Sequence, residues 1–74
     1  MNQLDNVIES FELELSHINE QFKQEMFWMK NTFDQLMDHP STMLFNRIKE
    51  EADSLQKLHI RRQSYIDVLA TLKK

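Results

Sequence analysis

Apolar residues recur through the first half of the chain at steps of three and four positions. Such steps place side chains on one side of an α-helix, so the pattern predicts a helix from about residue 3 to about residue 38. The residues of this apolar stripe are Leu4, Ile8, Phe11, Leu15, Ile18, Phe22, Met26, Met29, Phe33 and Leu36.

Two rows of residues make up this stripe. One row repeats strictly every seven residues from Ile8 to Leu36. The other row runs through Ile18 and then continues one residue late, at Met26 and Phe33. This slip predicts a stutter, which is a local shift of the apolar stripe around the helix.

The segment DHPST holds the only proline of the chain and predicts a turn at about residues 39–42. Pro40 disfavours helical geometry at His39, and Ser41 or Thr42 can cap a new helix by accepting a backbone N–H bond. Helical spacing then resumes without a breaker, which predicts a second helix over about 42–73. Its apolar residues are Leu44, Ile48, Ala52, Leu55, Leu58, Tyr65, Leu69 and Leu72.

Two helices and one turn predict a single all-α domain, residues 1–74, folded as an antiparallel two-helix hairpin. A turn near Pro40 means that the numbers of facing residues add to about 80. Tyr65 should then lie near Leu15, and Leu58 near Phe22. The composition agrees, because the chain has no glycine and one proline, which disfavours sheets and nucleotide-cradling loops.

The small size of the chain indicates that it needs additional stabilisation. A chain of 74 residues buries a modest fraction of its surface, and this one has no cysteine for a disulfide and no Cys/His cluster for zinc. We therefore expect the hairpin to complete a helical bundle or coiled coil by associating with another protein or with a second copy of itself.

Charge is distributed unevenly between the two halves. Residues 1–40 carry eight acids and two bases, net −6, whereas residues 41–74 carry four acids and seven bases, net +3. Opposite charges favour contact between the two helices of one chain. The basic cluster Lys57, His59, Arg61 and Arg62 contains no aromatic residue, so the pattern disfavours binding to nucleic acid.

Four consecutive apolar residues, Met26 to Met29, point to nearly every side of the first helix, because successive side chains are about 100° apart. Phe27 and Trp28 lie about 130° from the centre of the stripe, so one partner helix does not cover both. Exposed apolar surface of this kind indicates an interface, and we expect Met26, Phe27 and Trp28 to bind a partner. The alternative is that Trp28 lies over the edge of the hairpin with its indole N–H in water.

Two residues of the second helix extend the predicted partner-binding set. Ile60 is an isolated apolar residue outside the stripe, and Arg62 falls within the stripe. The guanidinium of Arg62 should either reach out to solvent or pair with a carboxylate on the first helix, such as Glu14 or Glu20. It could then set the register of the hairpin or contact a partner.

Catalytic and metal-binding chemistry is not indicated. Glu14, His17 and Glu20 resemble half of a di-iron carboxylate pattern, which requires two Glu-x-x-His motifs. No nucleophile is paired with a base, and no glycine is present to build a phosphate loop. We expect a protein that is not an enzyme and has no metal, no cofactor and no small-molecule substrate.

The location that the sequence predicts is the cytoplasm. The segment MNQLDNVIES has neither a basic region nor an apolar region typical of a secretory signal. No run approaches the roughly 18 apolar residues that span a bilayer, so no membrane contact is expected.

The opening MNQLD, a mid-chain turn and the closing ATLKK make the chain similar to the small E-type co-chaperones of type III secretion needle subunits. This resemblance implies a helical hairpin that pairs with a larger helical-repeat chaperone and keeps the needle subunit from polymerising. A cytoplasmic secretion co-chaperone or adaptor is therefore the expected function.

Two other functions remain open from the sequence. A homodimeric four-helix-bundle regulator could use its basic residues on nucleic acid. The stretch FDQLMDHPS followed by RRQS also resembles the turn region of the polymerising needle subunits themselves, although His39 stands where those proteins carry asparagine.

Overall fold

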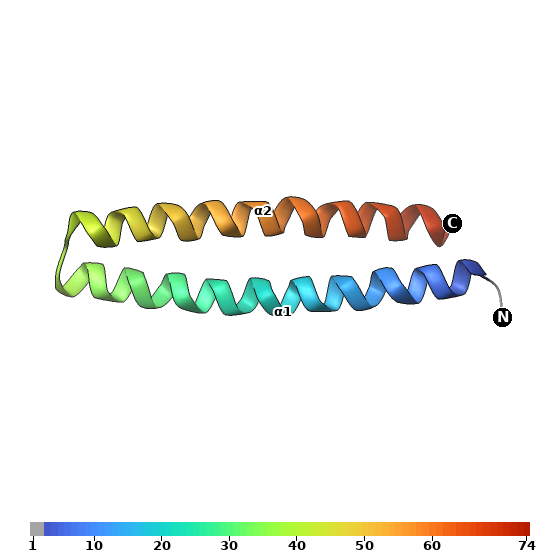
Figure 1. Cartoon of the computed structure of the whole chain (residues 1–74), viewed down its shortest axis with the longest axis horizontal. Helices are drawn as coiled ribbons and strands as arrows, with labels where there is room; N and C mark the ends of the chain where they lie inside the picture. Colours follow the sequence, from blue (N-terminus) through green and yellow to red (C-terminus); the bar gives the residue numbers. More distant parts are fainter. Residues whose placement is uncertain (1–2) are drawn as a thin grey trace.

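The computed structural model describes residues 3–74, which form two antiparallel helices joined by a short turn (Figure 1). Helix α1 spans Gln3–Asp38 and helix α2 spans Thr42–Leu72. The all-α helical hairpin expected from the sequence is confirmed. The rod measures 57 × 15 × 14 Å. Met1 and Asn2, which open the MNQLD stretch, lie outside the described residues.

Ser41 marks the start of α2. Its backbone is extended, with φ −149° and ψ 153°, and its hydroxyl oxygen accepts a hydrogen bond from the backbone N–H of Leu44 at 3.2 Å. This contact satisfies one of the backbone donors that every helix start leaves unpaired. Of the two capping residues expected from the sequence, the structure therefore selects Ser41.

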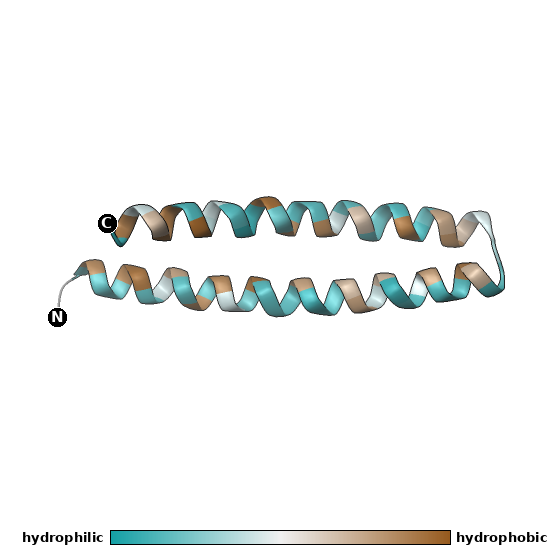
Figure 2. Ribbon diagram, turned by 180° about the vertical axis from the view of Figure 1, so that it is seen from behind, coloured by the Kyte–Doolittle hydropathy of each residue, from teal (hydrophilic) through white to brown (hydrophobic). Residues whose placement is uncertain are grey.

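The two helices meet along a continuous seam, by which we mean the residues of each helix that face the other at alternating steps of three and four. Every member of the seam is buried or half-buried, and Ile18 is the least exposed at 2%. Figure 2 shows hydrophobic positions recurring along the whole length of both helices. On α1 the seam is Ile8, Phe11, Leu15, Ile18, Phe22, Glu25, Met29, Thr32 and Leu36, and on α2 it is Leu44, Ile48, Glu51, Leu55, Leu58, Arg62, Tyr65, Leu69 and Leu72.

The stutter expected in the first helix is wrong. Glu25 and Thr32 occupy the seam, while Met26 and Phe33 remain 52% and 46% exposed. The seven-residue repeat therefore continues unbroken, which keeps the same side of α1 against α2 throughout. Thr32 is buried with little penalty because its hydroxyl donates to the backbone carbonyl of Trp28 at 3.1 Å.

A similar correction applies to Ala52 on α2. The sequence placed Ala52 in the apolar stripe, but the structure leaves it exposed and turns Glu51 into the seam. Unbroken spacing of the seam residues outweighs the apolar character of a single side chain here as well.

Contacts between the helices fix their register. The hydroxyl of Ser54 donates to the carboxylate of Glu25 at 2.8 Å, which agrees with the expected pairing of facing residues. The ring of Tyr65 lies 5.4 Å, centre to centre, from the ring of Phe11, about one turn along from the expected neighbour Leu15. The helices are thus held in register by side chains of several kinds.

Two ion pairs join the acidic first helix to the basic second helix. Glu12 pairs with Lys73 at 3.2 Å, and Glu14 pairs with Arg61 at 3.8 Å. All four side chains are about half exposed, so each pair contributes at most about 1 kcal/mol. The pairs also identify the heptad positions that face each other: those of Glu12 and Lys73 on one side of the seam, and those of Glu14 and Arg61 on the other.

Candidate partner-binding surface

One edge of the hairpin carries large exposed apolar side chains. Met26 and Phe33 occupy the same heptad position on α1 as Glu12, and Phe45 and Ala52 the same position on α2 as Lys73. Because Glu12 and Lys73 pair with each other, these heptad positions lie along the same side of the seam. We call the four residues Met26, Phe33, Phe45 and Ala52 the apolar edge.

A groove of about 270 Å³ lies on the apolar edge and is lined by Met26, Met29, Lys30, Phe33 and Leu55. Met29 and Leu55 belong to the seam and form its floor, while Met26 and Phe33 rise beside it from α1. All the lining residues except Lys30 are apolar. The groove is shallow and open, and its apolar lining suits the apolar side of a further helix.

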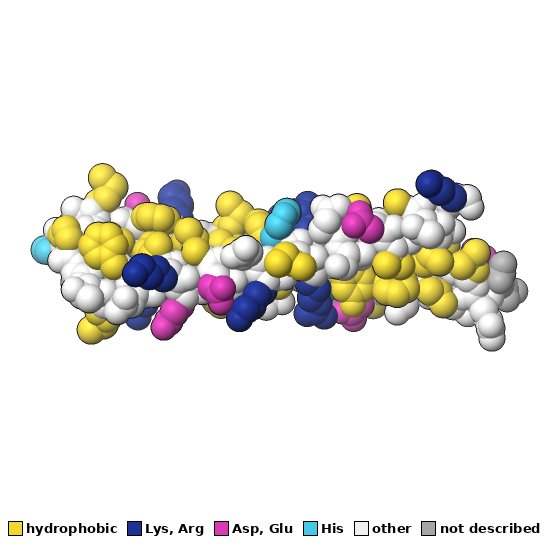
Figure 3. Space-filling model, turned by 90° about the horizontal axis from the view of Figure 1, so that it is seen from above, with side chains coloured by type: hydrophobic (Ala, Val, Ile, Leu, Met, Phe, Trp, Pro, Cys, Tyr) yellow, Lys and Arg dark blue, Asp and Glu magenta, His cyan; other side chains and the backbone are white. Residues whose placement is uncertain are grey.

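Seen from above, the surface of the molecule is divided along its length (Figure 3). Hydrophobic side chains gather at the end that carries the turn and again toward the opposite end, with charged side chains between them. Phe45, which is 54% exposed, belongs to the part of α2 next to the turn. By their positions within α1 and α2, the four residues that define the apolar edge all lie in the half of the rod that contains the turn.

Trp28 lies on the opposite side of the seam from the apolar edge. It occupies the same heptad position as Glu14, whose partner Arg61 marks that side. Trp28 lines one hollow of about 160 Å³ together with Glu25, Glu50, Glu51 and Ser54. It also lines a second hollow with Asn31, Thr32, Gln35, Arg47 and Glu51. The neighbours of the indole are thus mostly polar, and we call this side the polar edge.

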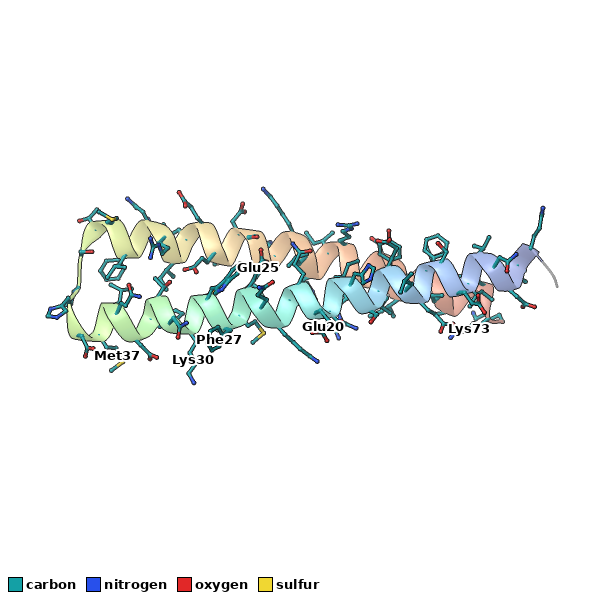
Figure 4. All side chains as sticks on the ribbon, turned by 60° about the horizontal axis from the view of Figure 1, so that its bottom comes forward. Glu20, Glu25, Phe27, Lys30, Met37 and Lys73 are labelled. Atoms are coloured by element: carbon teal, nitrogen blue, oxygen red, sulfur yellow. The ribbon has the colours of Figure 1, made fainter. Side chains whose placement is uncertain are left out.

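The predicted partner-binding residues are not brought together by the fold. Met26 lies on the apolar edge and Trp28 on the polar edge, whereas Phe27 and Ile60, 62% and 59% exposed, lie on the outer sides of α1 and α2. Figure 4 shows Phe27 projecting from α1 away from the seam, as Lys30 and Met37 also do. A contact between any of these residues and a partner stays a prediction.

Arg62 occupies the seam, as its place in the sequence indicated, but its expected pairing with Glu14 or Glu20 is wrong. Its guanidinium carbon lies 5.8 Å from the centre of the Phe22 ring, and its Nε is buried without a hydrogen-bond partner. Glu14 pairs with Arg61 instead, and Glu20 pairs with Lys23. The side chain of Arg62 lies over an aromatic face, where a cation–π contact replaces a carboxylate.

The seam contains two glutamates, Glu25 and Glu51, which the apolar pattern of the sequence did not predict. The Oε2 atom of Glu25 and the Oε1 atom of Glu51 are buried without a hydrogen-bond partner. Figure 4 shows Glu25 between the helices. Extending the row Phe11 and Ile18 by seven residues at a time reaches Glu25 and then Thr32, so the periodicity alone could have placed them there.

Replacing Glu25 with leucine is expected to stabilise the hairpin. A buried carboxylate oxygen without a partner costs about 1–3 kcal/mol, which leucine would remove while adding apolar contact to the seam. We expect this gain to outweigh the loss of the hydrogen bond from Ser54 to the other carboxylate oxygen, which contributes about 1 kcal/mol. We expect E25L to raise the free energy of unfolding, measured by urea denaturation, by about 1 kcal/mol or more. Glu20→Leu is the matched control, because Glu20 is 74% exposed and gains no burial. Equal stability of E25L and the wild type would mean that water already satisfies the carboxylate.

The described part of the chain holds neither a metal-binding cluster nor a membrane-spanning helix. Within residues 3–74, no three His, Cys, Asp or Glu side chains lie close enough together to hold a metal ion, and this includes Glu14, His17 and Glu20. No helix within the same residues is long and apolar enough to cross a bilayer. Comparisons with protein-family models, curated proteins and solved structures found no match to this chain.

Proposed function

We propose that this protein is a non-enzymatic protein-binding module that takes up partner helices along its apolar edge. The observation that carries the proposal is that Met26, Phe33 and Phe45 stay about half exposed after the hairpin has closed. Aromatic and methionine side chains in an exposed cluster are typical of interfaces. A partner helix in the groove would cover these side chains and gain the free energy of removing them from water.

The resemblance to E-type co-chaperones supports a cytoplasmic secretion co-chaperone or adaptor as the form that this module takes. In that role the hairpin would bind a larger helical chaperone and help to keep a secreted subunit from polymerising. The rod-like hairpin suits this role because it offers a long edge rather than an enclosed pocket. Binding would extend the two-helix seam into a bundle of three or more helices.

A homodimeric four-helix-bundle regulator is the alternative. The observation that favours it is the small core, since the buried apolar residues within the described part of the chain are Ile18, Leu36, Leu58 and Leu69. A second copy would enlarge that core. The link to nucleic acid is less well supported, because Lys57 pairs with Asp53 and Arg61 with Glu14.

Light scattering across a dilution series separates the proposal from its alternatives. The proposal predicts a monomer at micromolar concentration, because the apolar edge would bind a different protein rather than a second copy. A dimer that persists on dilution would contradict it and favour the four-helix bundle. A molar mass that keeps increasing with concentration, as filaments form, would favour a polymerising, needle-like subunit.

A further inference from the structure

Lysine side chains flank the apolar edge on both helices. Lys30 on α1 is four residues from Met26 and three from Phe33, and Lys49 on α2 is four residues from Phe45. Residues three or four apart are neighbours on a helix surface, so each lysine stands beside an exposed apolar residue. Lys30 also lines the groove itself.

These two lysines are not neutralised within the hairpin. Neither Lys30 nor Lys49 forms an ion pair within residues 3–74, in contrast to Lys23, which pairs with Glu20, and Lys57, which pairs with Asp53. No carboxylate lines the groove. Unpaired positive charge therefore flanks the apolar edge on both helices, at the groove itself through Lys30 and beside Phe45 through Lys49, although the whole chain has a net charge of −3.

We propose that the groove binds an amphipathic helix from another protein, with Asp or Glu residues on both flanks of its apolar stripe. This inference rests on the proposed function and names the chemistry of the partner. The apolar stripe of the partner helix would lie beside Phe33, over Met29 of α1 and Leu55 of α2. Acidic residues on one flank would meet Lys30 and those on the other flank Lys49. Charge at the rim of an apolar contact selects the partner and fixes its register.

A second copy of the chain fits the apolar edge poorly. A two-fold interface uses the same patch on both chains, so the apolar edge would meet another apolar edge. The lysines of one copy would then approach the lysines of the other, and like charges brought together at an interface disfavour association. An acidic helix from a different protein meets no such repulsion.

Two synthetic helical peptides test the proposal directly. Both carry the same leucine stripe, and the flanking positions are glutamate in one and lysine in the other. Binding to the full-length protein is measured by fluorescence anisotropy of a dye on the peptide. We expect the glutamate-flanked peptide to bind at least about tenfold more tightly at low salt, with the difference shrinking as salt screens the charges. The net negative charge of the protein alone would favour the lysine-flanked peptide. Tighter binding of the glutamate-flanked peptide would therefore indicate an effect of the local positive charge beside the groove.

Charge-reversal variants test whether Lys30 and Lys49 cause the preference for the glutamate-flanked peptide. The double variant K30E/K49E should lose or reverse the preference for the glutamate-flanked peptide. The matched control is R47E/K57E, which changes the net charge equally but alters Arg47 on the polar edge and Lys57 on the outer side of α2. This control should keep the preference. Circular dichroism of both variants checks that each remains helical.

The outcomes separate this proposal from the function on which it rests. If both peptides bind equally, and Phe33→Ala weakens both, the groove is a binding site but the acidic partner is wrong. If K30E/K49E and R47E/K57E change the preference equally, Lys30 and Lys49 are not the cause and the proposal is overturned. If neither peptide binds, the groove does not accept helices and the proposed function fails with it.

Discussion

Replacing Ile18 with alanine is expected to lower the free energy of unfolding by about 2–5 kcal/mol. Ile18 is the most deeply buried residue within the described part of the chain, at 2% exposure, and lies midway along the α1 seam. Its truncation removes apolar burial and leaves a cavity that a two-helix seam has few neighbouring side chains to fill. Urea or thermal denaturation followed by circular dichroism measures the change.

Ile60→Ala is the matched control for this truncation. The chemical change is the same, but Ile60 is 59% exposed on α2 and has little burial to lose. We expect its effect to stay within about 0.5 kcal/mol of the wild type. If the two variants were equally stable, the seam would not be the core of the protein. Leu58, at 7% exposure on α2, is expected to behave like Ile18.

Replacing Phe33 with alanine is expected to weaken binding of the glutamate-flanked peptide by about 2 kcal/mol, or roughly thirtyfold. Aromatic side chains at the centre of an interface contribute most of the binding free energy, and Phe33 lines the groove from the apolar edge. The free energy of unfolding should change much less than for Ile18→Ala, because Phe33 is 46% exposed in the free hairpin. Peptide titrations of both proteins measure the difference.

Phe27→Ala provides the comparison at a second aromatic position. Phe27 is 62% exposed and projects from the outer side of α1 (Figure 4). We expect this substitution to leave peptide binding nearly unchanged. The reverse pattern, with binding lost in Phe27→Ala and kept in Phe33→Ala, would move the interface to the outer side of α1.

The hairpin itself could be predicted because its determinants are local in the sequence. Apolar spacing of three and four residues gives a helix on either side of Pro40, and the Ser41 hydroxyl is close enough in sequence to cap the second helix. The chain contains no glycine, which disfavours additional turns or loops that would interrupt the two helices. These signals need no knowledge of how the helices pack against each other.

Which residues of α1 face α2 in the half of the helix nearer the turn was harder to predict. There, hydrophobicity and the seven-residue periodicity favour different residues. Met26 and Phe33 are more apolar than Glu25 and Thr32, yet the unbroken seven-residue repeat places Glu25 and Thr32 against α2. Ser54 offers Glu25 a hydrogen bond across the seam, which sequence spacing alone does not reveal. The apolar edge is the consequence, since it consists largely of residues that the repeat turned outward.

Arg62 shows a second limit of reasoning from sequence. Its place in the stripe was evident, but the choice between a carboxylate and an aromatic ring as its neighbour depends on side-chain directions. Arg61 reaches Glu14 along the polar edge, and Arg62 lies over Phe22 in the seam. The difference of one position along the helix rotates the side chain by about 100° and decides which partner it meets.

Site-specific photo-crosslinking in the native host would show whether the apolar edge is the surface that binds another protein. A benzoyl-phenylalanine replaces Phe33 on the apolar edge in one variant and Trp28 on the polar edge in another, and mass spectrometry identifies the covalent products. We expect a discrete adduct with one other protein from the Phe33 position and none from the Trp28 position. No adduct from Phe33, or one formed from Trp28 alone, would contradict the claim that the apolar edge is the binding surface.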